Sequence, residues 1–116
     1  MSTYTGSCHC GAVRYEVDGT FDKLIECNCS HCSQKGFLLF FVPRDALRVT
    51  AGEDALQTYT FNRHAIRHRF CRTCGVEPFA EGAMPDGSPI AAINARCLEG
   101  VELADIPRKL VNGREF

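Results

Sequence analysis

Alternation of apolar and polar residues is the clearest pattern near the start of the chain. Val13, Tyr15 and Val17 fall on one side of an extended segment, and polar residues fall between them. This two-residue period predicts a half-buried strand over residues 12–17. We expect a second strand over residues 21–26, which leads the chain into a group of closely spaced cysteines.

Further along, residues 37–42 form a continuous apolar run between Gly36 and Pro43. A short run of this kind, rich in aromatic residues, is typical of a buried strand in the core, and the alternative is that residues 37–41 form a wall of the substrate pocket. Residues 90–95 predict a last strand of small residues, and the glycine- and proline-containing segment 82–89 predicts a loop.

A hairpin is predicted from residues 57–70, with its second arm starting at His64. In an extended arm His64 and His68 share a face with Ile66 and Phe70, because side chains alternate along a strand. We interpret the two histidines as hydrogen-bonded residues at the edge of the core, with a role in a site as the alternative. Short strands and little helical periodicity together predict a mainly β fold.

Composition limits the functions that are plausible. The chain has 116 residues, which suits one domain over residues 1–116, with 45% hydrophobic and 23% charged residues. A net charge of −1 gives no basic surface for nucleic acid, and the apolar runs are too short to cross a membrane. The N-terminal residues lack the pattern of a secretory signal, so we expect a cytoplasmic protein.

The eight cysteines are unusual for a chain of this size. They occur in tight groups, whereas disulfide frameworks generally join distant segments, and thiols stay reduced in the cytoplasm. A disulfide within C-x-C would also close a small, strained ring. Metal binding is therefore a better interpretation of these cysteines than disulfide formation.

Cysteine pairs near the two ends of the patterned region supply four thiolates: Cys8, Cys10, Cys71 and Cys74. Four thiolates make a closed tetrahedral site for Zn²⁺. Such a site would join segments more than sixty residues apart and stabilise the fold. We therefore predict one structural zinc ion.

The segment Cys27-Asn28-Cys29-Ser30-His31-Cys32 brings three more thiols together at C-x-C-x-x-C spacing, without an obvious fourth ligand. An open fourth position is the feature that separates catalytic zinc sites from structural ones. Three thiolates with Zn²⁺ carry one negative charge, which suits a soft, exchangeable ligand such as a substrate thiol. Lys35 is the nearest cation in the sequence that could balance a fourth thiolate.

Other interpretations of these cysteines remain open. His31, His9 or His64 could complete a second structural site, or the three thiols could be reduced and metal-free. Zinc storage or redox sensing is a further option. Cys97 stands alone and is interpreted as a small buried apolar residue.

Four motifs resemble the glutathione-dependent formaldehyde-activating enzyme family, also called the CENP-V/GFA domain. Residues 6–13 (GSCHCGAV) resemble its opening motif, and residues 27–32 resemble its C-x-C-S-x-C motif. Residues 70–75 (FCRTCG) resemble its F-C-x-x-C-G motif, and residues 94–98 (NARCL) resemble its closing segment.

The resemblance implies a β-tent fold of small antiparallel sheets around a four-cysteine structural zinc. It also implies a second, labile zinc at Cys27, Cys29 and Cys32, where glutathione acts. The family reaction condenses formaldehyde with glutathione to S-hydroxymethylglutathione, as a carbon–sulfur lyase. Many members continue the central motif with Arg-Lys, whereas this chain has Ser33-Gln34 followed by Lys35. The expected partner is therefore a small-molecule thiol such as glutathione, and the alternative is a non-catalytic zinc module that binds a small thiol or a protein.

Overall fold

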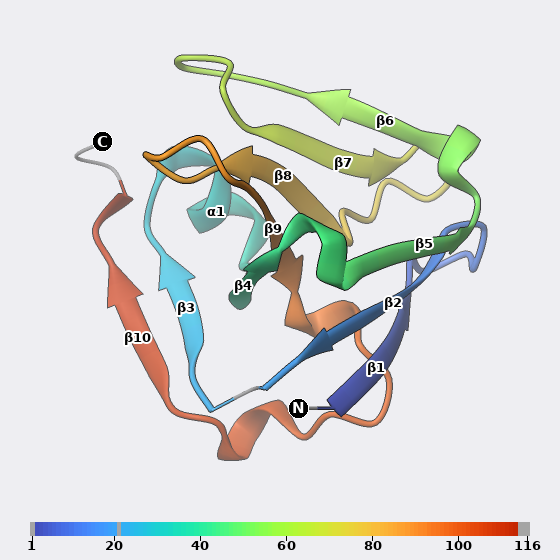
Figure 1. The fold of residues 1–116 in the computed structure, drawn as a ribbon, viewed down its shortest axis with the longest axis horizontal. Helices are drawn as coiled ribbons and strands as arrows, with labels where there is room; N and C mark the ends of the chain where they lie inside the picture. Colours follow the sequence, from blue (N-terminus) through green and yellow to red (C-terminus); the bar gives the residue numbers. More distant parts are fainter. Residues whose placement is uncertain (1, 21, 114–116) are drawn as a thin grey trace.

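The structure is a computed structural model that describes residues 2–20 and 22–113. Its strands form two sheets, which enclose the core (Figure 1). The mainly β class predicted from the sequence is confirmed. α1 (Ser30–Lys35) is the one α-helix within the described ranges, and none of their helices is long and apolar enough to cross a membrane. Short 3-10 helices occupy Arg44–Ala46, Glu53–Ala55, Ala95–Cys97 and Leu103–Asp105.

The smaller sheet contains β1 (Ser2–Ser7), β2 (Arg14–Gly19) and β5 (Leu47–Ala51) in the order β1-β2-β5, with antiparallel neighbours. The alternation predicted for β2 is correct, because Val13, Tyr15 and Val17 are at most 1% exposed. β1 was not predicted, since its polar residues show no apolar face of their own and the strand is held by pairing with β2.

The larger sheet has the order β10-β3-β4-β9-β8-β7-β6. Its strands are β3 (Leu24–Cys27), β4 (Leu39–Pro43), β6 (Leu56–Tyr59), β7 (Arg67–Cys71), β8 (Phe79–Ala83), β9 (Pro89–Asn94) and β10 (Arg108–Val111). All neighbours pair antiparallel except β10 and β3, which are parallel. The parallel pair follows from the long connection after β9, which crosses the bottom of the molecule in Figure 1 and returns the chain beside β3. Of the strand predicted at 21–26, residue 21 lies outside the described residues.

The apolar run 37–42 is only partly buried. Phe40 and Val42 are 5% and 6% exposed, whereas Phe41 between them is 53% exposed. β4 is an interior strand, paired with β3 and β9, so its alternate side chains point to opposite faces of the sheet. One face packs on the core and the other faces a cavity. The interpretation of this run as core is therefore wrong at Phe41, which lines the cavity as the alternative interpretation had it.

The predicted hairpin exists, but its second arm starts at Arg67 and its loop is longer than predicted. Asn62 and His64 both have left-handed backbone conformations, with φ of 56° and 57°. His64 lies in this loop, where Nδ1 is 2.7 Å from the Thr60 hydroxyl, and is not in the strand. A left-handed conformation cannot continue a strand, so the expectation that His64 shares a strand face with His68 was wrong.

Glu81 on β8 is buried among arginines. Arg44 Nε donates to one carboxylate oxygen at 2.6 Å and Arg69 donates to the other at 2.9 Å. Burial works to raise the pKa of Glu81, but these hydrogen bonds outweigh it and lower the pKa below its usual value. The charged form of Glu81 is therefore stabilised in the folded protein.

We expect Glu81→Gln to lower the free energy of unfolding at pH 7 by about 2 kcal/mol, since two charge-assisted hydrogen bonds are weakened. A carboxyl whose pKa is lowered by folding stabilises at neutral pH, and that contribution is lost as the pH falls through the folded pKa. Urea unfolding should therefore show a difference between variant and wild type that shrinks below about pH 4. Glu99→Gln, which weakens the exposed pair with Arg14, is the control and should change stability very little. Equal effects of the two substitutions would contradict this assignment.

Candidate functional site

Two turns bring four cysteine sulfurs together. Cys8 and Cys10 lie in the turn between β1 and β2, where the Cys8 amide donates to Val13 O at 3.1 Å. Cys71 ends β7, and Cys74 lies in the turn that follows, where the Gly75 amide donates to Cys71 O at 2.8 Å. These residues, the four-cysteine cluster, have ligand atoms that all lie within 4.8 Å of one another. The structure thus joins the two predicted pairs.

The spacing of these sulfurs fits a tetrahedral metal site. Cys10 Sγ lies 3.6 Å from Cys8 Sγ and 3.7 Å from Cys71 Sγ. Two sulfurs at about 2.3 Å from one zinc ion would be separated by roughly 3.8 Å. All eight cysteines are free thiols, and these separations are far longer than a disulfide bond of about 2.05 Å. The donor set therefore fits Zn²⁺.

Backbone hydrogen bonds prepare part of this cluster for ionisation. Burial works to raise the pKa of Cys74, but the backbone amides of Cys10 and Val76 hold it at about 6. The pKa of Cys10 is raised to about 11, because burial and its neighbouring thiols outweigh the hydrogen bond from the Ala12 backbone, which acts in the opposite direction. The cluster thus favours some thiolates, and a cation is required before all four can ionise together.

The three-cysteine cluster consists of Cys27, Cys29 and Cys32, whose sulfurs also lie within 4.8 Å of one another. Cys27 ends β3, Cys29 caps α1, and Cys32 lies in its first turn. Amide groups point at these sulfurs: Cys29 N donates to Cys27 Sγ at 3.4 Å, and Cys32 N donates to Cys29 Sγ at 3.3 Å. The short helix was missed in the sequence because six residues show no helical periodicity.

The local environment shifts the pKa values of Cys29 and Cys32 in opposite directions. Burial works to raise the pKa of Cys29, but the Cys32 amide and the neighbouring thiols outweigh it and lower that pKa. Burial and the other two cysteines raise the pKa of Cys32. Within residues 2–20 and 22–113, no fourth Cys, His, Asp or Glu joins this cluster. The three-cysteine cluster can therefore hold a metal ion while leaving one position for another ligand.

The C-terminal strand closes one side of the three-cysteine cluster. The Asn28 amide donates to Val111 O at 3.1 Å, and the Asn28 side chain donates to Asn112 at 2.8 Å. Gly113 is buried directly against Cys27, and a methyl group at this position would overlap Cys27 Sγ. Glycine is therefore required here to keep the Cys27 sulfur in place.

We expect Gly113→Ala to weaken zinc binding at the three-cysteine cluster by about 10- to 100-fold, the range for disturbed neighbours of metal ligands. Competition with a chromophoric chelator measures this affinity. Gly82→Ala is the matched control, because its methyl group would lie 3.7 Å from Ile66, an ordinary contact. Wild-type zinc affinity in Gly113→Ala would contradict the proposed contact.

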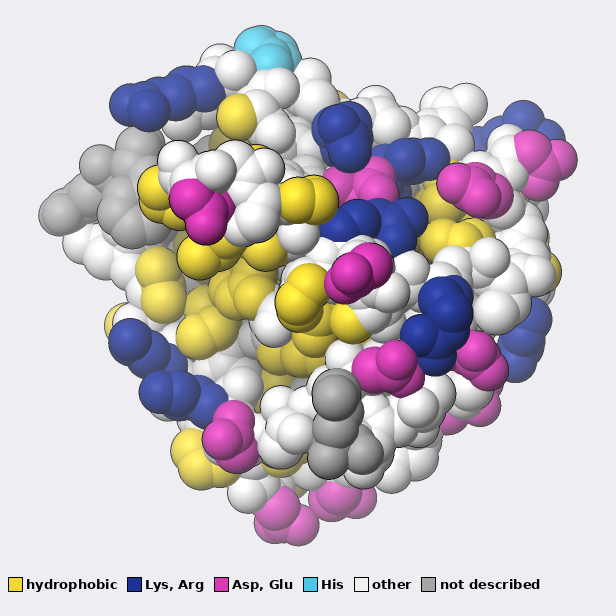
Figure 2. Space-filling view, viewed as in Figure 1, with side chains coloured by type: hydrophobic (Ala, Val, Ile, Leu, Met, Phe, Trp, Pro, Cys, Tyr) yellow, Lys and Arg dark blue, Asp and Glu magenta, His cyan; other side chains and the backbone are white. Residues whose placement is uncertain are grey.

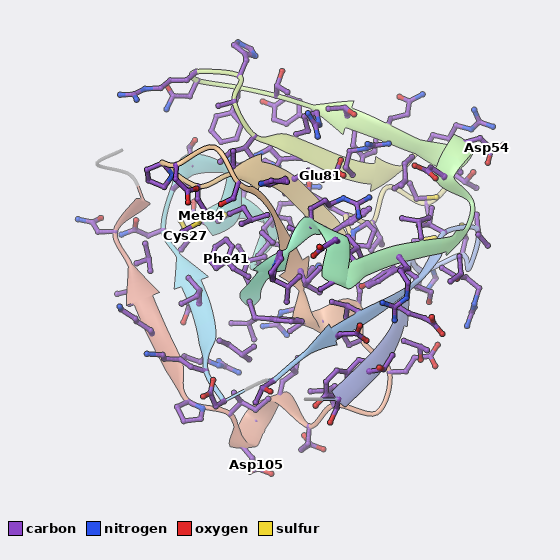
Figure 3. The ribbon with its side chains drawn as sticks, viewed as in Figure 1. Cys27, Phe41, Asp54, Glu81, Met84 and Asp105 are labelled. Atoms are coloured by element: carbon purple, nitrogen blue, oxygen red, sulfur yellow. The ribbon has the colours of Figure 1, made fainter. Side chains whose placement is uncertain are left out.

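A cavity of about 640 Å³, here called the thiol cavity, has all three cysteines of this cluster in its wall. Its apolar wall is formed mainly by Ile25, Phe37, Leu39, Phe41, Phe61 and Ile66. Figure 2 shows hydrophobic side chains gathered in a hollow between β3 and β9. Figure 3 labels Cys27 and Phe41 in this region, and both residues line the cavity. The volume is typical of small-molecule sites, about 300–1,000 Å³.

Two further residues in this wall carry chemistry that the sequence did not reveal as a unit. His68 on β7 is 7% exposed and Glu77 is 5% exposed. His68 Nδ1 lies 3.2 Å from Glu77 Oε2, and both residues line the thiol cavity. The interpretation of His68 as a hydrogen-bonded histidine is correct for Nδ1, and the ring also faces the site. His68 and Glu77 are nine positions apart in the sequence, and this spacing belongs to no recognised motif.

His31 completes a cluster with this pair. Its Nε2 lies 3.5 Å from Glu77 Oε1, and its ring centre lies 4.3 Å from that of His68. Burial lowers the pKa of His31, although the Glu77 carboxylate acts in the opposite direction. These three side chains could hold a metal ion. His31 does not belong to the three-cysteine cluster, and it lines a second, smaller hollow of about 420 Å³.

The remaining candidate residues lie away from the thiol cavity. Lys35 is exposed and lines the second hollow with His31 and Tyr59, so its role toward a substrate stays a prediction. His9 is exposed and does not join the three-cysteine cluster, so it does not complete a second structural site there. Cys97 is half-buried against the core, and burial raises its pKa to about 11. A thiol with that pKa is protonated and unreactive at neutral pH.

Comparison with known proteins identifies the family. Residues 3–108 match the family described as glutathione-dependent formaldehyde-activating enzyme, GFA. The chain belongs to the GFA family. The match includes the four-cysteine and three-cysteine clusters, and the two sets of sulfurs are compatible with zinc binding in this family.

A solved structure supports the fold of this GFA-family chain. It is a crystal structure of a Rhodobacter sphaeroides protein, with 33% sequence identity and a TM-score of 0.78. The alignment covers 90% of the present chain and 99% of the other. The β architecture described above is therefore shared with an experimentally determined structure.

Proposed function

We propose that this GFA-family protein is a zinc-dependent carbon–sulfur lyase that acts on a thiol adduct. The family reaction, in which glutathione and formaldehyde give S-hydroxymethylglutathione, is the reference case. The observation that supports an enzyme is the thiol cavity, which is lined both by the three cysteines and by the His68–Glu77 pair. A purely structural zinc site has no need of an adjoining cavity or of a buried imidazole beside it.

Zinc at Cys27, Cys29 and Cys32 would supply positive charge that keeps a substrate thiol deprotonated at neutral pH. The three cysteines fix the place where the substrate sulfur is held. The apolar wall excludes water around that sulfur, which strengthens electrostatic interactions inside the cavity. The four-cysteine cluster takes the structural role and lies outside the reaction.

Adduct formation requires one proton transfer at each end of the new bond. The thiol loses its proton, the sulfur forms a bond to the aldehyde carbon, and the carbonyl oxygen gains a proton. We assign the last step to His68. Nδ1–H donates to the Glu77 carboxylate, so the imidazolium form of His68 can give the proton on Nε2 to the oxygen, and the neutral ring can take it back in the reverse reaction. Glu77 is a positioning residue, because it acts through the imidazole.

We expect His68→Asn to lower kcat for adduct formation by about 10²-fold or more, the usual contribution of a general acid. Zinc at the two cysteine clusters should stay unchanged, since His68 is in neither of them. His64→Asn is the matched control, because His64 is exposed and asparagine tolerates its left-handed backbone. The assay follows adduct formation from formaldehyde and a panel of thiols, across pH.

Loss of the acidic or basic limb of the pH profile in His68→Asn, with metal retained, is the signature of proton transfer by this residue. Full activity of the variant with every thiol would refute the assignment to His68. An absence of any carbon–sulfur chemistry in the zinc-loaded wild type would refute the proposed function itself, and would favour the non-catalytic zinc module.

A further inference from the structure

The wall of the thiol cavity is dominated by carbon. Aromatic and aliphatic side chains come from four separate parts of the fold: β3, β4, the loop between β6 and β7, and β8 with β9. Polar contributions come from Asn62, Arg63, His68, Glu77 and Asn94. Three of these are already engaged within the protein, because His68 pairs with Glu77 and the Asn94 side chain donates to Glu77 O at 3.0 Å. The cavity therefore offers few polar groups to a ligand.

Charge in this wall does not match a charged tripeptide. Glutathione carries carboxylates and an ammonium group, and burying each charge requires a partner. Among the described residues, Arg63 is the one lysine or arginine that lines the thiol cavity, and it lies in the exposed loop at the rim. Lys35 lies on the second hollow. Glu77 is the lining carboxylate, and the two histidines already surround it.

Apolar side chains remain open to solvent at the same place. Phe41 is 53% exposed and Ile66 is 51% exposed, although both line the thiol cavity. They approach from different elements, Phe41 from β4 and Ile66 from the loop that precedes β7. Apolar residues that line a cavity beside a candidate metal centre, and are left open, are best explained by an apolar ligand that covers them.

We propose that the thiol cavity takes the uncharged, apolar carbon skeleton of a thiol adduct, with the sulfur at the three-cysteine cluster and the skeleton against Phe41 and Ile66. This inference rests on the proposed function and names the substrate class for the same site. It assigns specificity to the apolar wall. Glutathione then binds more weakly than an apolar thiol, because among the described lining residues its charged groups find only the Arg63 cation.

Calorimetric titration of the zinc-loaded full chain with ethanethiol, butanethiol, hexanethiol and glutathione tests this substrate class. Each added methylene that enters the cavity should tighten binding by about fourfold, so hexanethiol should bind on the order of 10²-fold tighter than ethanethiol. Glutathione should bind more weakly than hexanethiol. Zinc content measured after each titration confirms that the metal is retained.

Phe41→Glu identifies the surface responsible. We expect it to weaken hexanethiol binding by about tenfold or more, and to weaken ethanethiol binding by a smaller factor, because the longer chain buries more apolar surface against this wall. Leu110→Glu is the matched control: Leu110 is 70% exposed, is not part of the cavity wall, and its replacement should preserve the whole series.

Affinity that does not depend on chain length, or glutathione binding tighter than hexanethiol, would overturn the apolar substrate class while leaving a thiol-binding site in place. A failure of every thiol to bind would overturn both this inference and the proposed function.

Discussion

Cys71→Ala should leave the protein without a cooperative folding transition. Cys71 is fully buried at the end of β7, and its sulfur lies 3.7 Å from that of Cys10 in the turn between β1 and β2. The four-cysteine cluster thus links the small sheet to the large one. Structural zinc contributes an apparent ~10–16 kcal/mol in small zinc domains, whereas whole domains have a net stability of about 5–15 kcal/mol. Thermal unfolding followed by circular dichroism, together with zinc content, measures the effect.

Cys97→Ala is the matched control for this experiment. Cys97 packs against the same core but is not a member of either cysteine cluster. Its replacement removes one sulfur and should shift the melting temperature by only a few degrees, the usual effect of a small change in a partly buried side chain. A Cys71→Ala variant that melts as cooperatively as Cys97→Ala, and at a similar temperature, would contradict a structural metal site.

Cys27→Ala, unlike Cys71→Ala, should retain the fold but lose the ability to form the thiol adduct. Cys27 is half-buried at the end of β3, and its sulfur belongs to the three-cysteine cluster alone. Removing it leaves the four-cysteine cluster intact, so unfolding should stay cooperative. We expect one zinc ion fewer per chain and a loss of adduct formation of at least about 10²-fold, since metal stabilisation of charge contributes several kcal/mol.

Zinc analysis and the formaldehyde–thiol assay on the same preparation measure both effects, with Cys97→Ala again as the control. The decisive comparison is between zinc content and activity. If Cys27→Ala kept its full metal content and wild-type activity, the three-cysteine cluster would not be the site of the reaction.

Much of the metal chemistry could be predicted from the sequence because its ligands are local. Cys27, Cys29 and Cys32 must lie close together whatever the fold, since only a tight turn separates them. Cys8 and Cys71 are far apart in the sequence. Two sulfurs fill only two of the four ligand positions of a tetrahedral zinc site, so each cysteine pair needs the other pair to complete it. The number of ligands that zinc requires therefore predicted a long-range contact that secondary-structure patterns do not predict.

The acid–base part of the site could not be predicted in the same way. His68 and Glu77 are brought together because β7 ends, turns through the cysteine segment and returns toward β8. Their spacing matches no motif, and each alone is common in soluble proteins. For Lys35, closeness in sequence was misleading. It is near the cysteines along the chain, but it lies in the last turn of α1 and lines the second hollow, not the thiol cavity.

Strands without an apolar pattern were also missed. β10 shows no alternating burial, and what holds it is its parallel pairing with β3, including the Leu24 amide donating to Pro107 O at 2.9 Å. The apolar run containing Phe41 was predicted to be a strand, but a continuous apolar run could not show which of its side chains face the core and which face a cavity. In both cases the deciding contacts are long-range in sequence.

The central claim is that the three-cysteine cluster holds an open, thiol-accepting zinc ion. The most direct test is elemental analysis and native mass spectrometry of protein purified anaerobically, with and without added thiol. We predict two zinc ions per chain, one for each cysteine cluster, and a change at only one of them when thiol is added, seen as a bound thiol or a displaced ion. A single zinc ion that thiols never affect would contradict the claim and would leave a structural metal site alone.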